Sequence, residues 1–130
     1  MFLLLDLSAR DLIHLALFTP ESIVHTNIAG RNRELLTVLE QFLAGQKLDK
    51  KDVKGIMVVV GAGGFTNTRI AIVVANTFAY SEKVPLLAIT KDQVPKIQEL
   101  IGELLQQPIG QYISATYSAA PNITAPKNTL

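Results

Sequence analysis

The sequence predicts one α/β domain built on a single sheet. Three short segments separated by turn residues open the chain, which is typical of an antiparallel meander. After residue 30 the apolar residues recur at helical spacing, and between the helical segments lie short apolar runs typical of buried strands. With 130 residues, of which 48% are hydrophobic, the chain has room for one core and not for two full domains.

The first 30 residues predict three strands. Residues 2–7 form an apolar run that ends in turn chemistry at residues 8–11. Residues 12–18 are apolar on both faces, which suits a central strand. Residues 22–28 are richer in polar side chains, so we expect this third strand nearer an edge of the sheet.

Two helices are predicted after the meander, over residues 33–44 and 67–80. In the first, leucines and a phenylalanine recur at helical spacing, and in the second nearly every residue is apolar. The expected end residues are Asn32 as N-cap and Gly45 as C-terminal stop for the first helix, and Thr66 or Asn67 as N-cap for the second.

The remaining elements complete the order βββαβαβα. A strand is predicted over residues 55–60 and another over 85–90, because both are short and rich in aliphatic residues. A third helix is expected to begin near Pro95, a favourable first-turn position, and to end before Pro108. Residues 1–108 then form the folded subdomain, and residues 109–130, rich in Ser, Thr, Ala and Asn, form an extended or partly disordered tail.

Composition excludes several classes of function. The formal net charge is +1, so no global electrostatic attraction to nucleic acid or a membrane surface is expected. There is no cysteine, hence no disulfide, thiolate metal site or thiol nucleophile, and the two histidines stand far apart in sequence. No apolar run reaches the ~20 residues of a membrane span. We therefore expect a soluble, cytoplasmic protein with no metal site and no resident cofactor.

The glycine-rich segment at residues 61–69 is the most informative candidate site. It joins a predicted buried strand to a predicted helix, where backbone N–H groups and the helix N-terminus can hold a phosphate. It lacks the Gly-Lys-Ser/Thr of a phosphate-binding loop and the third glycine of a dinucleotide fingerprint. The alternative is a tight turn that needs glycine for close packing or positive φ. The weak cofactor-binding candidates are Asp6, Gly61, Gly63 and Thr66.

Other polar residues receive mainly structural interpretations. Asp6 ends the first predicted strand, where a carboxylate more often accepts hydrogen bonds from a turn or pairs with a basic group than binds a metal. His14 and His25 lie within strands with no Ser, Cys or Asp at a motif spacing, so both are interpreted as structural. Arg69 could bind an anion or a partner's carboxylate, or could simply be solvated.

The helix predicted over residues 67–80 leaves almost no polar face. A helix that is apolar all round must be covered all round, which favours association through a helix of another chain. The alternative is that the first and third helices of the same chain cover it completely.

The sequence resembles the bacterial TsaB family, also called YeaZ, of tRNA threonylcarbamoyladenosine biosynthesis. The resemblance rests on residues 60–72, Val-Gly-Ala-Gly-Gly-Phe-Thr-Asn-Thr-Arg-Ile-Ala-Ile, and on Leu-Asp-Leu-Ser at residues 5–8. It covers residues 1–90 well, and residues 117–127 weakly resemble the ending of some members. The positions that match the family motifs are Asp6, Ser8, Gly61, Gly63, Phe65, Thr66 and Arg69.

This resemblance implies a ribonuclease-H-like fold, related to the actin and Hsp70 ATPases, in a shortened form that lacks most of the second subdomain. It also implies a non-catalytic scaffold, because the related ATPases close two subdomains over the nucleotide. In the family, TsaB pairs with the catalytic subunit TsaD through its first two helices, and TsaE, an ATPase, joins them. The complex transfers threonylcarbamoyl to adenosine 37 of certain tRNAs, and TsaB alone forms homodimers through the same surface.

The expected interface therefore lies on the helices at residues 33–44 and 67–80, with tRNA met only through the complex. Two alternatives stay open: a small nucleotide-binding enzyme fragment that uses Asp6 and the loop at 61–66, and a homodimerisation module unrelated to tRNA modification. The expected interface residues are Leu36, Leu39, Leu43, Arg69, Ile70, Val73, Val74 and Asn76.

Overall fold

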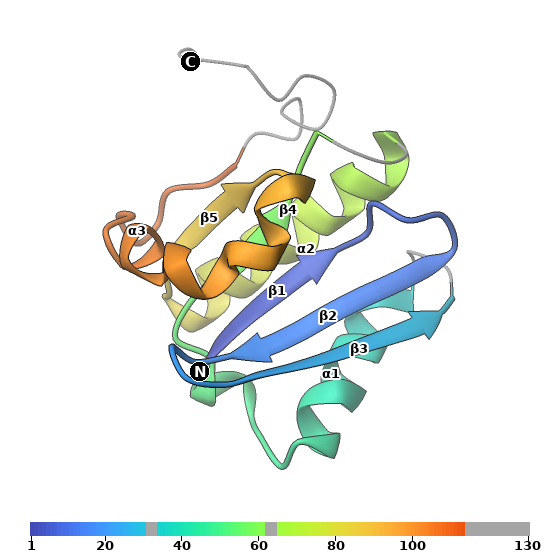
Figure 1. The fold of residues 1–130 in the computed structure, drawn as a ribbon, viewed down its shortest axis with the longest axis horizontal. Coiled ribbons are helices and arrows are strands. Elements are labelled where there is room, and N and C mark those ends of the chain that lie inside the picture. The colour runs from blue at the N-terminus through green and yellow to red at the C-terminus, as the bar shows by residue number, and fades with distance from the viewer. Residues whose placement is uncertain (31–33, 62–64, 114–130) are drawn as a thin grey trace.

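The computed structural model describes residues 1–30, 34–61 and 65–113. They form a five-stranded sheet with the order β3-β2-β1-β4-β5 and helices on both faces, the mixed α/β fold that the sequence predicts (Figure 1). The strands are β1 (Phe2–Asp6), β2 (Leu12–Phe18), β3 (Ile23–Ala29), β4 (Ile56–Val59) and β5 (Leu86–Ile89). The helices are α1 (Leu35–Gly45), η2 (Lys50–Asp52), α2 (Phe65–Glu82), η3 (Lys91–Leu100) and α3 (Ile101–Leu105), where η denotes a 3₁₀ helix.

Strand pairing changes direction at β1. This strand runs antiparallel to β2, with Asp6 opposite His14, and parallel to β4, with Leu5 opposite Val58. The β4–β5 pair is also parallel. Parallel neighbours require crossover connections, and α2 supplies the one between β4 and β5. As a result the carboxyl ends of β1, β4 and β5 meet at one edge of the sheet.

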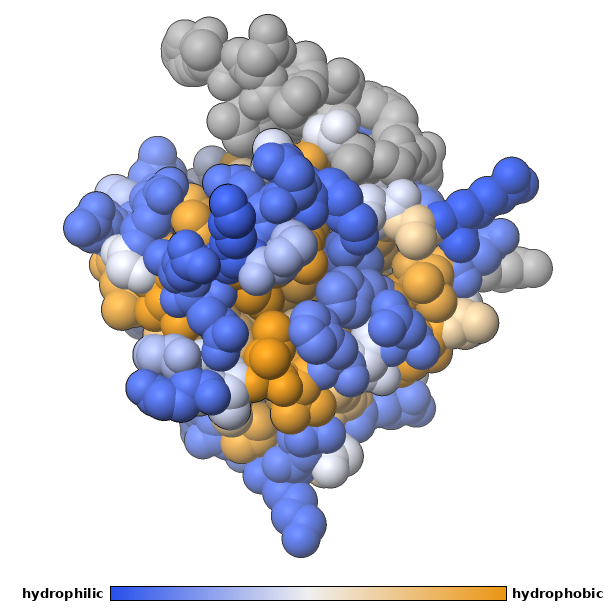
Figure 2. All heavy atoms as spheres, in the orientation of Figure 1, coloured by the Kyte–Doolittle hydropathy of each residue, from blue (hydrophilic) through white to orange (hydrophobic). Residues whose placement is uncertain are grey.

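The sheet separates two hydrophobic cores. Alternation along β1 sends Leu3 and Leu5 into the core under α1 and α2, and Phe2 and Leu4 into the core under η3 and α3. All five residues of β1 are buried, because both of its faces are covered. In Figure 1, η3 and α3 lie in front of the sheet, with α1 and α2 behind it. Figure 2 shows that hydrophobic side chains reach the surface between charged and polar ones on the η3–α3 face.

The third predicted helix starts earlier than expected and takes another form. The segment is a 3₁₀ helix from Lys91, with Pro95 inside it, and only residues from Ile101 are α-helical. Gln93 explains the early start, because its Oε1 accepts a hydrogen bond from the Thr90 backbone N–H at 2.8 Å. Proline at 95 has no N–H to donate within the helix, which disfavours an α-helix here.

Helix α2 also begins earlier than predicted, at Phe65, so Thr66 and Asn67 lie inside it and neither is its N-cap. The expected N-cap of the first helix, Asn32, is outside the described residues. Gly45, expected as the stop after residue 44, is the last residue of α1, and Gln46 is the C-cap. In the part of the chain that the structure describes, no helix has both the length and the hydropathy to cross a membrane.

Gly55 stands where α3 approaches the start of β4. A Cβ added at Gly55 would lie 2.8 Å from Leu104 Cδ2 and 3.1 Å from Phe2 Cδ1, and both of these side chains are buried. At Gly102, in α3, an added Cβ has no neighbour within 4 Å. Glycine is thus required at the first position and dispensable at the second.

We predict that Gly55→Ala lowers the free energy of unfolding by about 1–3 kcal/mol, because the buried neighbours must shift to admit the methyl group. Gly102→Ala, the matched control, should instead raise stability by about 0.5–1 kcal/mol, because alanine favours the helix. Urea denaturation of both variants measures the difference. Equal stability of the two would contradict the close packing at Gly55.

Candidate functional site

The candidate site lies at the carboxyl ends of β1, β4 and β5. Asp6 ends β1, Gly61 follows β4 and Lys91 follows β5, so parallel pairing brings all three to one edge of the sheet. In open α/β sheets, ligands bind at this edge. Asp6 and Gly61 are two of the residues that the sequence singles out, whereas Lys91 has no motif around it.

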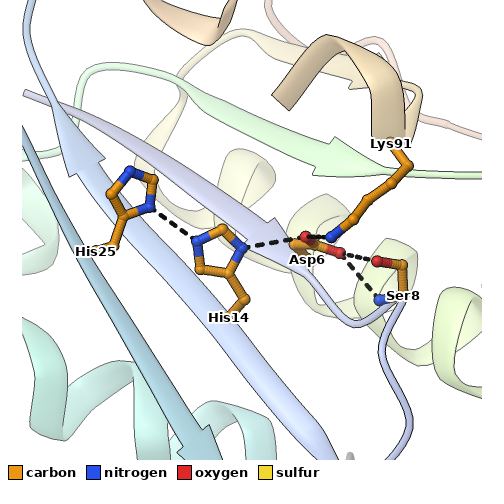
Figure 3. Close-up of polar contacts among 5 residues, drawn as sticks. All are labelled: Asp6, Ser8, His14, His25 and Lys91. Atoms are coloured by element: carbon orange, nitrogen blue, oxygen red, sulfur yellow. Dashed lines mark hydrogen bonds and ion pairs between the residues drawn. The ribbon is translucent and has the colours of Figure 1, made fainter. Parts of the chain in front are cut away.

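The Asp6 carboxylate is buried, with 1% of its surface exposed, and it accepts four hydrogen bonds. Oδ1 accepts from the Ser8 backbone N–H at 2.9 Å and from the Ser8 hydroxyl at 2.5 Å. Oδ2 accepts from the Lys91 ammonium at 2.6 Å and from His14 Nδ1 at 3.1 Å. Figure 3 shows these donors converging on one carboxylate from the turn after β1, from β2 and from the start of η3.

These contacts decide the charge of Asp6. Burial alone raises its pKa, but the hydrogen bonds from His14, Lys91 and Ser8 together hold the pKa far below the ordinary value of 3.8. Asp6 is therefore a carboxylate, with Lys91 as its charge partner. Its acceptor sites are used by the protein itself, which agrees with the sequence interpretation of a turn acceptor paired with a basic group.

The hydrogen bonds continue from Asp6 to the surface across three neighbouring strands. His14 Nε2 lies 2.9 Å from His25 Nδ1, and the two rings stack with their centroids 5.1 Å apart. Because Asp6 accepts from His14 Nδ1, a neutral His14 has an acceptor at Nε2, so His25 Nδ1 is the donor. Burial, and after it the charge of His14, lowers the pKa of His25 below its ordinary value of 6.5.

The sequence indicates a structural role for both histidines, but no motif in it points to this arrangement. The signal was the hairpin register, because strands at 2–7 and 12–18 with a short turn place Asp6 opposite His14. In the β2–β3 pair, His25 lies opposite Ala16, which puts it diagonal to His14. Lys91 gave no such signal, since it is 85 residues from Asp6.

The glycine-rich loop is described only in part. Gly61 has φ 76°, the left-handed conformation that the tight-turn alternative requires of a glycine. Gly63 lies outside the described residues, and so does the side chain of Thr66. No group of three or more His, Asp or Glu side chains that could hold a metal ion is found among the residues that the structure describes.

The predicted interface residues separate into two groups. Leu39 and Leu43 are buried in the core under α1, so the expectation that they meet a partner is wrong for this pair. The apolar side of α1 faces the sheet, so of these three leucines only Leu36 lies on the outer side of the helix, where it is half-exposed. On α2, Val73 is 55% exposed, whereas Ile70 and Val74 are partly buried against the same core. Arg69 is exposed near the start of the helix.

Helix α3 does not cover α2, contrary to one alternative, because the two lie on opposite faces of the sheet (Figure 1). Asn76, another predicted interface residue, is half-buried and has a partner within the chain. Its side-chain amide bonds to the backbone of Ile113 in this same chain.

A protein-family model described as TsaD: tRNA N6-adenosine threonylcarbamoyltransferase matches residues 24–120. Among solved structures, "YeaZ from Pseudomonas aeruginosa" is similar, with 26% identity and a TM-score of 0.61 over 68% of this chain and 44% of that one. A second structure is titled "Crystal structure of an uncharacterized protein with similarity to peptidase YEAZ from Pseudomonas aeruginosa". It has 26% identity and a TM-score of 0.62 over 68% of this chain and 42% of that one.

The chain thus spans less than half the length of the two YeaZ-like structures. No curated protein matches it. These similarities confirm the ribonuclease-H-like fold and the resemblance to TsaB that the sequence indicates. The matching family model describes a catalytic protein.

We predict that Asp6→Asn lowers the free energy of unfolding by about 2 kcal/mol near pH 7, because hydrogen bonds to a buried charge are lost. The folded pKa is lowered, so the native carboxylate stays charged where the unfolded chain binds a proton. Its stabilisation is complete above the ordinary pKa of 3.8 and is lost as pH falls below that value.

The difference between wild type and Asp6→Asn in urea denaturation should therefore narrow as pH falls below about 4. Glu40→Gln is the control, because Glu40 pairs with Lys50 at the exposed surface. This substitution should change the free energy of unfolding by less than about 1 kcal/mol. A difference in the free energy of unfolding between wild type and Asp6→Asn that stays constant down to pH 2 would contradict the ion pair.

We also predict that the pKa of His25 lies below 6.5 in the wild type and rises towards 6.5 in His14→Gln. Removing His14 removes its charge, while the burial of His25 in part remains, so the pKa should rise only part of the way. Two-dimensional NMR of the imidazole resonances measures both midpoints. A His25 midpoint that does not move in His14→Gln would show that the two rings are not coupled.

Proposed function

Because the chain belongs to the family described as TsaD, tRNA N6-adenosine threonylcarbamoyltransferase, we propose that it acts in tRNA threonylcarbamoyl modification as a non-catalytic partner subunit. The observation that carries the proposal is the match of the family model to residues 24–120 of a fold shared with YeaZ. We propose that its partners are a TsaD-like catalytic subunit and a TsaE-like ATPase, with tRNA reached only through the complex. Alone, the chain forms a homodimer.

The Asp6 contacts support a non-catalytic role. An acidic residue that served a phosphate-bound cation would need free acceptor positions facing the ligand. At Asp6, four donors of the chain itself use both oxygens, and Lys91 supplies the positive charge. The carboxylate therefore stabilises the fold at the edge of the sheet where related folds have their active sites. In this proposal the partner subunit carries out the catalysis.

The surface of α1 and α2 supports the pairing role. Leu36 on α1 and Val73 and Tyr80 on α2 are large apolar or aromatic side chains with half or more of their surface exposed. Singly exposed hydrophobic residues are common, but these belong to two helices that contact each other on one face of the sheet. We therefore propose that the exposed side of the α1–α2 pair packs on a helix pair of the partner.

Light scattering on a sizing column tests the function directly. The full chain is mixed with the TsaD-like subunit of its host, and the mass of the eluting species is measured. A mixed complex is the expected result. A homodimer that ignores the catalytic subunit would remove the partner role and leave the fold assignment standing.

We predict that Val73→Glu weakens this complex at least tenfold, because pairing would bury a carboxylate without a partner in an apolar contact. The fold should change little, since the side chain of Val73 is 55% exposed in the free chain. Leu105→Glu is the matched control, at 56% exposure on the opposite face of the sheet. An undiminished Val73→Glu complex, or an equal loss for both variants, would contradict pairing through α2.

A further inference from the structure

The segment that follows α3 returns to α2, where the side chain of Asn76 forms hydrogen bonds with its backbone. The Asn76 side chain donates from Nδ2 to the Ile113 carbonyl at 2.8 Å and accepts the Ile113 N–H at Oδ1 at 3.0 Å. A neighbouring β-strand offers a residue the same pair of hydrogen bonds. Asn76 thus binds both the N–H and the C=O of residue 113. This contact does not depend on the side chain at position 113.

Two side-chain contacts accompany this pair of hydrogen bonds. Ile113 is partly buried against the core under α1 and α2. The ring of Tyr112 lies against the ring of Tyr80, with centroids 6.2 Å apart and the planes inclined by 48°. This geometry is favourable for an aromatic pair. Backbone, aliphatic and aromatic contacts therefore fix residues 112–113 on the helix.

The docked segment leaves the exposed side of α2 open. Val73, Asn76 and Tyr80 are spaced by three and four residues, so they lie along one side of the helix. With the segment in place, Tyr80 is still 69% exposed and Tyr112 is 51% exposed. The segment consequently adds an exposed aromatic ring beside the side of α2 that carries Val73, and does not shield it.

We propose that Tyr112 is part of the pairing surface, next to Tyr80, and that Asn76 is the positioning residue that places it there. The inference rests on the proposed function, in which this surface packs on a helix pair of the TsaD-like partner subunit. Tyrosine suits such a contact, since it offers a large surface with few rotatable bonds and a hydroxyl for the polar rim. The pairing surface then includes a segment that follows α3, in addition to the two helices.

The experiment uses the full chain with the TsaD-like subunit and compares three variants with wild type. Tyr112→Ala should weaken the complex about fivefold or more, measured by titration calorimetry. Asn76→Ala should weaken it by a similar factor and should also speed hydrogen exchange at the Ile113 amide about tenfold or more, because the acceptor of that N–H is lost. Leu105→Ala, a large-to-small change at an exposed position on the opposite face, is the control and should change neither.

The outcomes separate this inference from the proposed function. Loss of pairing in Val73→Glu with wild-type pairing in Tyr112→Ala and Asn76→Ala overturns the role of the segment and leaves the partner function intact. A wild-type chain that does not pair at all overturns both. Circular dichroism melting checks each fold, and Tyr112→Ala alters an exposed side chain, so it decides the matter even where Asn76→Ala is destabilised.

Discussion

The complete burial of β1 is the constraint from which the rest of this structure follows. A strand with five buried residues needs a covering layer on each face and a neighbouring strand on each side. The antiparallel neighbour β2 comes directly from a short turn, but the parallel neighbour β4 requires a crossover, and the next parallel strand, β5, requires a second one. Both crossovers place their helices, α1 and α2, on the same face, which leaves η3 and α3 to cover the other.

Alternation along β1 also puts a charge under the second layer. Phe2 and Leu4 face the core below η3 and α3, and Asp6 is the next residue on that side of the strand. An unpaired buried carboxylate would be costly, so the layer above has to supply a cation and donors. Lys91 at the start of η3 does so, while Gln98 near its end donates to the Thr19 carbonyl at 2.9 Å. The 3₁₀ segment is thus positioned on the sheet by polar contacts near both of its ends, in addition to Ile97 in the core.

The sequence was sufficient for the fold and for only part of the site, and the difference has a physical origin. Periodicity depends on near neighbours, so it locates the strands and the two long helices, and hairpin geometry would have placed Asp6 opposite His14. Periodicity alone did not fix which leucines of α1 face the sheet, because that depends on the rotation of the helix on it. The sequence therefore predicts an interface with Leu36, Leu39 and Leu43, of which the structure buries the last two and leaves Leu36 half-exposed. The contacts of Lys91 with Asp6 and of Asn76 with Ile113 join residues 85 and 37 positions apart, and no local pattern encodes them.

The two faces of the sheet consequently differ in kind. The η3–α3 layer covers a hydrophobic core and is held in addition by an ion pair and by hydrogen bonds from side chains to the backbone. The α1–α2 layer is held by aliphatic packing, and aliphatic packing leaves side chains such as Val73 outside whenever a helix has more apolar positions than the sheet can cover. In α2 the first polar residue after Val73 is Asn76, and its amide is used to seat Ile113. Because the Asn76 amide is hydrogen-bonded within the chain, a partner that packs on this side of α2 need not supply hydrogen bonds to it.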